Sequence, residues 1–198
     1  KVLIVPSLED LNLYKANIND LRPINISDLL FREKVSDKNL SYIRDNVYAK
    51  NICVTGAGGS IGSELCRQIL KFKPKKLILI DNFEFNLYRI NHELNEEKNT
   101  TFECYLNDVK NTSYLSNLFQ KENIDIVYHA AASKHVPLVE KNPLYGISNN
   151  VFSTLSVCKA AIDSNTNQVI LISTDKAVRP TNVMGASKRL AENIIQAF

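Results

Sequence analysis

The chain has 198 residues, of which 44% are hydrophobic and 23% are charged, and its net charge at pH 7 is +3. This composition is typical of a globular protein and excludes a largely disordered chain. The small, dispersed positive charge argues against a nucleic acid as partner, and no apolar run is long enough to span a bilayer.

The cysteines are spread along the chain and form no close C-x-x-C pair; they are Cys53, Cys66, Cys104 and Cys158. This spacing favours reduced, buried thiols in a cytoplasmic protein over a disulfide framework. The sequence also offers no ligand pattern for a metal, so we expect none.

Residues 1–50 carry weak structural signals. We expect a strand over residues 1–6, a short helix over 7–14, a capped helical turn over 27–31 and a helix over 37–49. The first strand begins abruptly. We therefore expect the chain to be part of a longer protein, with residues 1–50 as an extension or linker from a preceding region.

From residue 51 onward, strand and helix patterns alternate. We expect strands over residues 51–55, 76–80, 101–105, 124–129 and 168–173. We expect helices after residue 60 and over 84–98, 112–122, 143–164 and 184–198. This alternation predicts an α/β fold with a doubly wound parallel sheet, the Rossmann type, over residues 51–198. Such a domain typically has six strands, so we expect this one to be truncated before a C-terminal substrate part.

A glycine-rich stretch joins the first of these strands to its helix. Glycine lacks a Cβ, so the backbone can turn tightly and approach a pyrophosphate that lies at the helix N-terminus. The strand–turn–helix context favours a dinucleotide site over an ordinary tight turn. The residues expected to bind the cofactor here are Gly56, Gly58, Gly59, Ser60, Ile61 and Gly62.

Asp81 ends the second strand of this region, about twenty residues after the glycine loop, where an acid binds the adenosine ribose hydroxyls. A carboxylate there repels a 2′-phosphate, so we expect NAD rather than NADP. The alternative is that Asp81 caps the helix that follows. The ends of the third and fourth strands should add further cofactor contacts, from Asp108, Val109, Ala130, Ala131 and Ala132.

Polar side chains also follow the fourth and fifth strands. Lys134 and His135 are expected either to bind substrate or to be exposed loop residues. Thr174, Asp175 and Lys176 place a hydroxyl, a carboxylate and an amine at the binding edge of the sheet. Such neighbours can exchange protons with a substrate, although an ion pair that caps the loop is the simpler alternative.

Met184 and Lys188 lie four residues apart on the last helix and therefore share one face. A methionine has no proton to give, and its position alone is explained by core packing. Lys188 could reach a ribose or a phosphate.

Residues 55–65, 129–140 and 173–189 resemble the extended short-chain dehydrogenase/reductase superfamily. Within it, the chain is similar to the UDP-N-acetylglucosamine 4,6-dehydratases of the membrane-anchored bacterial polysaccharide and glycan biosynthesis group. The resemblance covers about residues 23–198. Most members of the superfamily have a catalytic tyrosine where this chain has Met184, and this subgroup shares the departure.

The resemblance implies NAD as cofactor and a UDP-sugar substrate that is oxidised at C4, loses water across C5–C6 and receives the hydride at C6. By this resemblance, Thr174 hydrogen-bonds the C4 oxygen of the sugar and Asp175 is the acid for the loss of water. Lys176 is the base that removes the C5 proton, and Lys188 orients the nicotinamide ribose. The division of roles between Asp175 and Lys176 stays open.

The resemblance further implies a homo-oligomeric parent enzyme, anchored at the cytoplasmic face of the inner membrane. Two alternatives are a nucleotide-sugar epimerase on the same fold and a non-catalytic nucleotide-binding module. The methionine at position 184 argues against the first, and the acid–amine pair at 175–176 argues against the second.

Overall fold

The computed structural model describes residues 3–4, 22–23, 37–95 and 101–198. The chain divides into two compact units, Lys1–Tyr42 and Ile43–Phe198. In the first unit, strand β1 (Leu3–Ile4) pairs antiparallel with β2 (Arg22–Pro23). The strand expected over residues 1–6 is therefore described only in part. The helix expected over 7–14 and the turn over 27–31 lie outside the described residues.

The second unit is built on a five-stranded sheet in the order β5–β4–β3–β6–β7, and every neighbouring pair is parallel. Its strands are β3 (Asn51–Thr55), β4 (Lys76–Asp81), β5 (Phe102–Leu106), β6 (Ile126–His129) and β7 (Gln168–Leu171). The chain runs outward from β3 to β5 and then returns to the other side of β3. At this switch point the loops that leave β3 and β6 diverge, and ligands of open α/β sheets bind in the crevice between them.

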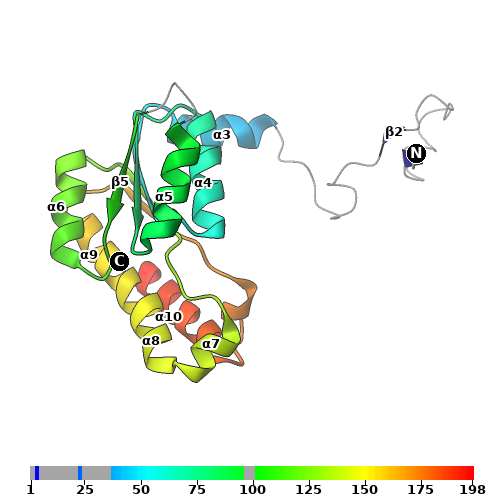
Figure 1. Ribbon diagram of the computed structural model, residues 1–198, viewed down its shortest axis with the longest axis vertical. Helices are drawn as coiled ribbons and strands as arrows, with labels where there is room; N and C mark the ends of the chain where they lie inside the picture. Colours follow the sequence, from blue (N-terminus) through cyan, green and yellow to red (C-terminus); the bar gives the residue numbers. More distant parts are fainter. Residues whose placement is uncertain (1–2, 5–21, 24–36, 96–100) are drawn as a thin grey trace. The chain divides into compact units, whose positions relative to one another are not determined.

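Helices cover both faces of this sheet (Figure 1). The longer helices are α3 (Asp37–Val47), α4 (Ser60–Lys71), α5 (Glu84–Asn95), α6 (Thr112–Glu122), α9 (Ser153–Asp163) and α10 (Val183–Ala197). Shorter segments are α7 (Val136–Lys141), α8 (Pro143–Ile147), the π-helical η2 (Ser148–Phe152) and the 3-10 turn η3 (Asp175–Ala177). No helix in the described ranges is long and apolar enough to cross a membrane.

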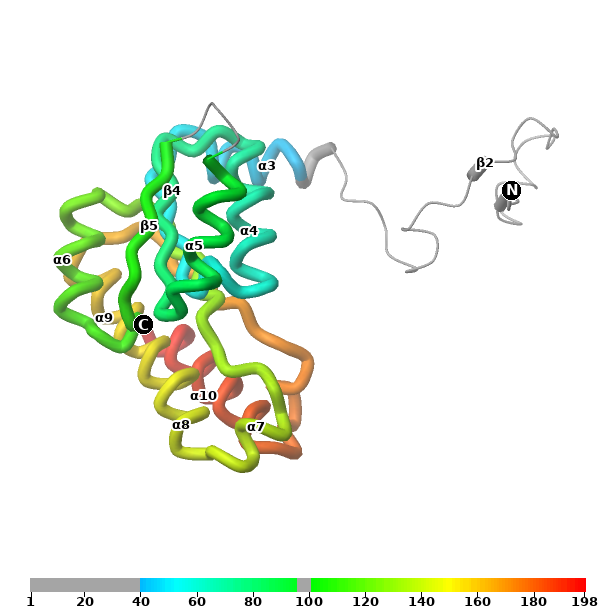
Figure 2. The backbone as a smooth tube through the Cα atoms, in the orientation of Figure 1, coloured from blue at the N-terminus to red at the C-terminus, as the bar shows by residue number. Residues whose placement is uncertain are grey.

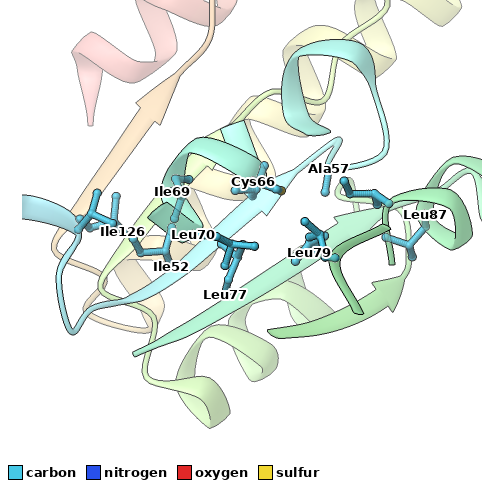
Figure 3. Packing of buried hydrophobic residues seen from close by; sticks show 13 residues of the cluster. Ile52, Ala57, Cys66, Ile69, Leu70, Leu77, Leu79, Leu87 and Ile126 are labelled. Atoms are coloured by element: carbon cyan, nitrogen blue, oxygen red, sulfur yellow. The ribbon is translucent and has the colours of Figure 1, made fainter. Parts of the chain in front are cut away.

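The nearly continuous apolar sequence of β4 follows from burial on both faces of the sheet. Leu77 and Leu79 point into a cluster with α4 and α5, as Figure 3 shows. Ile78 and Ile80 point to the opposite cluster, with α6 and α9. Val47 at the end of α3 is also buried in the first cluster. The predicted doubly wound α/β fold is confirmed.

The expected helix over residues 143–164 is present as three consecutive helical segments, and the structure adds a helix before it. Pro143 starts α8, and the helix then widens into η2 before α9 begins at Ser153. Pro137 lies in the first turn of α7, where proline is tolerated because its missing N–H has no helical partner. Figures 1 and 2 show α7, α8 and α10 together beyond the end of the sheet to which the β5 arrow points.

Candidate dinucleotide-binding and active site

The glycine loop between β3 and α4 turns sharply and packs closely on its own helix. Gly56 has a φ of +65°, which L side chains rarely adopt, and its carbonyl accepts a hydrogen bond from the Gly59 amide (3.0 Å). A Cβ on Gly62 would lie 2.0 Å from the Gly56 carbonyl oxygen. The first turn of α4 can therefore sit directly against the end of β3 only because Gly62 has no side chain.

Asp81 connects this loop to the turn after β4. Its Oδ2 accepts a hydrogen bond from the Gly58 amide (2.9 Å), and its Oδ1 accepts one from the Phe83 amide (2.9 Å). The carboxylate is buried. Asp81 therefore accepts a backbone hydrogen bond just before α5 begins, in line with the alternative that it caps this helix. It also fixes the position of the glycine loop through Gly58. Each carboxylate oxygen keeps a further lone pair that a ribose hydroxyl could use.

One cavity, of about 240 Å³, lies at the ends of β3, β4 and β5. Its lining contains the predicted residues Gly56, Gly59, Asp81, Val109, Ala130, Ala131 and Ala132. It also contains residues that the sequence reasoning missed, namely Asn82, Phe83, Asn86, Asn107, Ser133, Tyr145 and Asn149. The first four of these lie close after the ends of β4 and β5, and that position was the signal that could have identified them.

A second cavity, of about 320 Å³, lies on the other side of the glycine loop. Its lining contains the predicted residues Ser60, Ile61, Gly62, Lys134, Thr174, Lys176, Met184 and Lys188. The two cavities share Gly56, Gly59, Ala130, Ala132 and Ser133. A long ligand that crosses the glycine loop can therefore occupy both, which is the arrangement that a dinucleotide needs.

Four predicted site residues lie outside both linings. The Gly58 amide is turned toward Asp81, and the Asp108 carboxylate accepts a hydrogen bond from the Lys110 amide (2.9 Å). His135 lines a neighbouring cavity of about 450 Å³ between its own loop, α7 and α8. Asp175 lines none of these three cavities.

A buried network of polar side chains fixes the loop after β6. His129 contacts Thr55 (Nδ1 to Oγ1, 2.7 Å) and Thr154 (Nε2 to Oγ1, 3.1 Å), and burial lowers its pKa to about 3. Asn150 in η2 accepts a hydrogen bond from the Ser133 amide (2.7 Å) and donates one to the Ser133 carbonyl (3.0 Å). The alanines and Ser133 are thereby fixed beside the glycine loop.

Lys134 contacts the start of α4, and both partners line the second cavity. Its Nζ lies 2.5 Å from the Ser60 Oγ, next to the amides at the helix N-terminus. This position suits a phosphate oxygen, since the helix N-terminus and the ammonium group both favour negative charge. Lys134 is therefore as well placed for the cofactor pyrophosphate as for a substrate.

In the cluster that follows β7, Asp175 and Lys176 are exposed and Thr174 is partly buried. Thr174 donates a hydrogen bond from Oγ1 to Asp175 Oδ1 (2.9 Å), and Lys176 Nζ lies 3.6 Å from the same oxygen. These two neighbours lower the pKa of Asp175, whose side chain is 88% exposed. Lys176 lines the second cavity, whereas Asp175 faces solvent in this structure.

α10 brings Met184 and Lys188 to the floor of the second cavity. Met184 and Lys188 are 2% and 5% exposed, so both side chains are buried although they line the cavity. Lys188 donates from Nζ to the Ile172 carbonyl (2.7 Å), and burial lowers its pKa to about 8. Its ammonium group keeps two further donors for a bound ribose.

Among the residues that the structure describes, no group of three or more His, Cys, Asp and Glu side chains is placed to hold a metal ion. The polar groups of the site are instead hydroxyls, amides, amines and carboxylates around a glycine loop.

Comparison with known proteins connects this geometry to a family. A family model described as polysaccharide biosynthesis protein matches residues 52–198. The chain is 42% identical over 196 residues to the capsular polysaccharide biosynthesis protein CapD of Staphylococcus aureus, which covers 98% of this chain and 33% of CapD.

Two further relatives carry the names of enzymes. The chain is 32% identical over 149 residues to a UDP-N-acetylglucosamine 4,6-dehydratase (inverting) of Campylobacter jejuni, over 75% of this chain and 43% of that protein. It is 35% identical over 150 residues to a UDP-glucose 4-epimerase of Rickettsia massiliae, over 73% of this chain and 42% of that protein. The chain thus spans less than half the length of these relatives.

Among solved structures, the X-ray structure of Pen from Bacillus thuringiensis superimposes with a TM-score of 0.72 at 32% sequence identity. The match covers 76% of this chain and 47% of that one. The family model accounts for well over half of the chain, including the glycine loop, the residues after β7 and α10. The chain therefore belongs to the polysaccharide biosynthesis protein family, in agreement with its resemblance to short-chain dehydrogenases/reductases.

Proposed function

We propose that this chain is the cofactor-binding part of a nucleotide-sugar 4,6-dehydratase of bacterial glycan biosynthesis, with UDP-N-acetylglucosamine as substrate. One observation carries the proposal: a single cavity beside the glycine loop is lined by Thr174, Lys176, Met184 and Lys188. These residues provide a hydroxyl, a half-exposed amine and a buried amine, which are three of the groups that this reaction needs. The similarity to the Campylobacter dehydratase supports the same assignment.

The residues of the two cavities fit NAD. The glycine loop offers a close backbone approach at the N-terminus of α4, and Asp81 retains lone pairs beside the first cavity. A buried carboxylate at this place disfavours the extra phosphate of NADP. NAD⁺, when bound, would accept a hydride from C4 of the sugar and return it to C6.

Lys176 is proposed as the base at C5. Once C4 is a ketone, the neighbouring C5–H is acidified, and a positioned amine can remove this proton. Lys176 is half exposed and lines the cavity, so its amine is accessible to a sugar there. Thr174 would donate a hydrogen bond to the C4 oxygen, and Lys188 would hold the nicotinamide ribose.

Asp175 is proposed as the acid that protonates the departing C6 hydroxyl. The carboxyl group must hold a proton for this step, yet its surroundings in this structure lower its pKa. Burial raises the pKa of a carboxyl group. We therefore propose that the sugar, together with parts of the protein outside this chain, covers Asp175 when the substrate is bound.

The chain is proposed to be part of a longer enzyme, in which residues 1–50 connect the cofactor domain to a membrane-anchored region at the cytoplasmic face. A homo-oligomer is proposed for that enzyme. The substrate contacts from further residues would be absent from the 198-residue chain, so we expect this chain alone to have little or no activity.

A second candidate is a nucleotide-sugar epimerase, since a relative from Rickettsia massiliae is named UDP-glucose 4-epimerase. An epimerase also oxidises C4, but it keeps C5 and C6 intact. The methionine at position 184 favours the dehydratase, because a 4-epimerase would normally have the tyrosine there.

Product analysis distinguishes the two candidates. The full-length protein is incubated with UDP-N-acetylglucosamine, and the product is examined by mass spectrometry and NMR. A dehydratase gives a 4-keto-6-deoxy sugar that is lighter by one water. A C4 epimer of unchanged mass would favour the epimerase, and unchanged substrate would contradict both.

A further inference from the structure

The backbone that leaves β7 is attached to α10 by two side chains on successive turns of the helix. Lys188 Nζ donates to the Ile172 carbonyl (2.7 Å), and Ser173 Oγ donates to Glu192 Oε1 (2.6 Å). Because positions 188 and 192 are four residues apart, both contacts come from one face of α10. Thr174 follows Ser173 directly, so the segment of residues 174–176, here called the reacting segment, begins next to backbone that α10 holds in place.

The other end of this segment also rests on α10. A Cβ on Gly185 would lie 2.3 Å from the Lys176 carbonyl oxygen, so the helix backbone packs directly against η3. Residues 172–176 are therefore held by α10 at both ends, while the Thr174 and Lys176 side chains line the second cavity.

Glu192 also affects the charge of Lys188. Glu192 lies one turn after Lys188 on the same face of α10, and its negative charge opposes the effect of burial on the pKa of Lys188. The other charged or titratable groups nearby are His129, which burial keeps neutral, and the two lysines of the same cavity, Lys134 and Lys176. In the part of the chain that the structure describes, α7, α8, α9 and β7 add no charged side chain to the lining of this cavity.

Glu192 is itself ionised at neutral pH. The hydrogen bond from Ser173 lowers its pKa, and Arg189 contributes from Nη1 to Oε2 at 3.1 Å. With 24% of its side chain exposed, Glu192 is in contact with solvent, which weakens its electrostatic interaction with Lys188.

We propose that Glu192 is a positioning residue of this site: through Ser173 it fixes the backbone before Thr174, and from the next turn of α10 it places a negative charge on the helix face that carries Lys188. The first part rests on the proposed dehydratase function, whereas the second concerns cofactor binding and can be tested without turnover.

Two variants separate these effects in the full-length protein. Ser173→Ala removes the hydrogen bond but leaves the carboxylate. Glu192→Gln keeps an oxygen that can accept from Ser173 but removes the charge. Glu93→Gln serves as the control, because it removes another arginine-paired carboxylate, on α5 and away from both cavities. NAD⁺ affinity is measured by calorimetry between pH 6 and pH 9, with turnover and unfolding temperature alongside.

With Glu192→Gln, we expect NAD⁺ affinity to be unchanged at low pH and about threefold weaker at high pH. The reason is that loss of the negative charge lowers the pKa of Lys188, so the amine is deprotonated at a lower pH. With Ser173→Ala, we expect an unchanged pH dependence and about tenfold lower kcat, because the reacting segment is less well positioned. The control should change neither quantity.

An unaltered pH dependence of NAD⁺ affinity in Glu192→Gln would overturn the charge role. An equal loss of affinity at every pH, with a lower unfolding temperature, would show a purely structural role and overturn it as well. If no variant and no wild-type protein dehydrates the sugar but the pH shift is seen, the proposed function fails while the inference on Lys188 stands.

Discussion

Two aspartates at the binding edge of the same sheet have opposite surroundings. Asp81, at the end of β4, is 8% exposed and both of its oxygens accept backbone hydrogen bonds from the protein. Asp175, which follows β7, has an 88% exposed side chain that contacts its sequence neighbours Thr174 and Lys176. The glycine-loop side of the site is thus held by internal hydrogen bonds, whereas the segment after β7 is open to solvent at Asp175.

This difference separates binding from chemistry. Substitutions at Asp81 or in the glycine loop should alter both stability and cofactor affinity, because these residues make hydrogen bonds and close packing contacts within the folded protein. Changes after β7 should alter the rate with little effect on folding, because those side chains make few contacts. The following predictions test this contrast, from the largest expected effect to the smallest.

Lys176→Ala should reduce turnover by a factor of about 10²–10⁴, the usual contribution of a positioned general base. NAD⁺ affinity and unfolding temperature should stay at the wild-type values, since the lysine is half exposed. Lys159→Ala, at an exposed position on α9, is the control. Turnover by Lys176→Ala at the wild-type rate would remove this residue as the base.

Gly62→Ala should destabilise the fold by about 2 kcal/mol or more and abolish NAD⁺ binding, because its Cβ would lie 2.0 Å from the Gly56 carbonyl oxygen. Gly59→Ala is the matched comparison, since its Cβ would meet the same oxygen at 3.2 Å. Urea unfolding measures both variants. Equal stability of the two would contradict the close packing of α4 on the glycine loop.

Asp81→Ala should weaken NAD⁺ binding about tenfold, since two buried amides lose their acceptor, and should narrow the preference for NAD over NADP. Asp108→Ala should have a smaller effect, because Asp108 bonds to Lys110 and lines neither cavity. Calorimetric titration with both cofactors gives the two affinities. An unchanged ratio for Asp81→Ala would place ribose recognition on other residues.

The pH dependence of stability should show the smallest effect, at Glu122. This buried carboxylate lies 2.5 Å from Lys76 Nζ, and that hydrogen bond lowers its pKa. A lowered folded-state pKa gives stability that is complete above the unfolded value of about 4.3 and is lost as pH falls through the folded value. Between pH 6 and pH 3 we expect a loss of about 1 kcal/mol in urea unfolding. Glu122→Gln should flatten this slope, and a slope equal to the wild type would contradict the pairing.

Much of the fold follows from local patterns in the sequence. The β-branched and apolar runs of β3 and β4 indicated strands, and the glycine spacing indicated the turn into α4. These signals need no knowledge of distant residues. The helical end of the domain was harder, because Pro137 and Pro143 each start a short helix and η2 inserts a wider turn that no local pattern indicated.

The residues of the site were predictable where position along a strand determines their place. Thr174, Lys176, Met184 and Lys188 line one cavity because β7 and α10 bring them to the same edge of the sheet. Partners that depend on packing were not predictable. The contacts of Asn150 with Ser133 and of Glu192 with Ser173 join residues 17 and 19 positions apart, and no spacing rule relates them.

Isotope transfer tests the proposed function most directly. The full-length protein is incubated with UDP-N-acetylglucosamine that carries deuterium at C4 of the sugar, and the product is examined by NMR. We expect the deuterium at C6 of a 4-keto-6-deoxy sugar, because the hydride removed from C4 returns to the same molecule. Deuterium that remains at C4 of an epimer, or a product without deuterium at C6, would contradict the assignment.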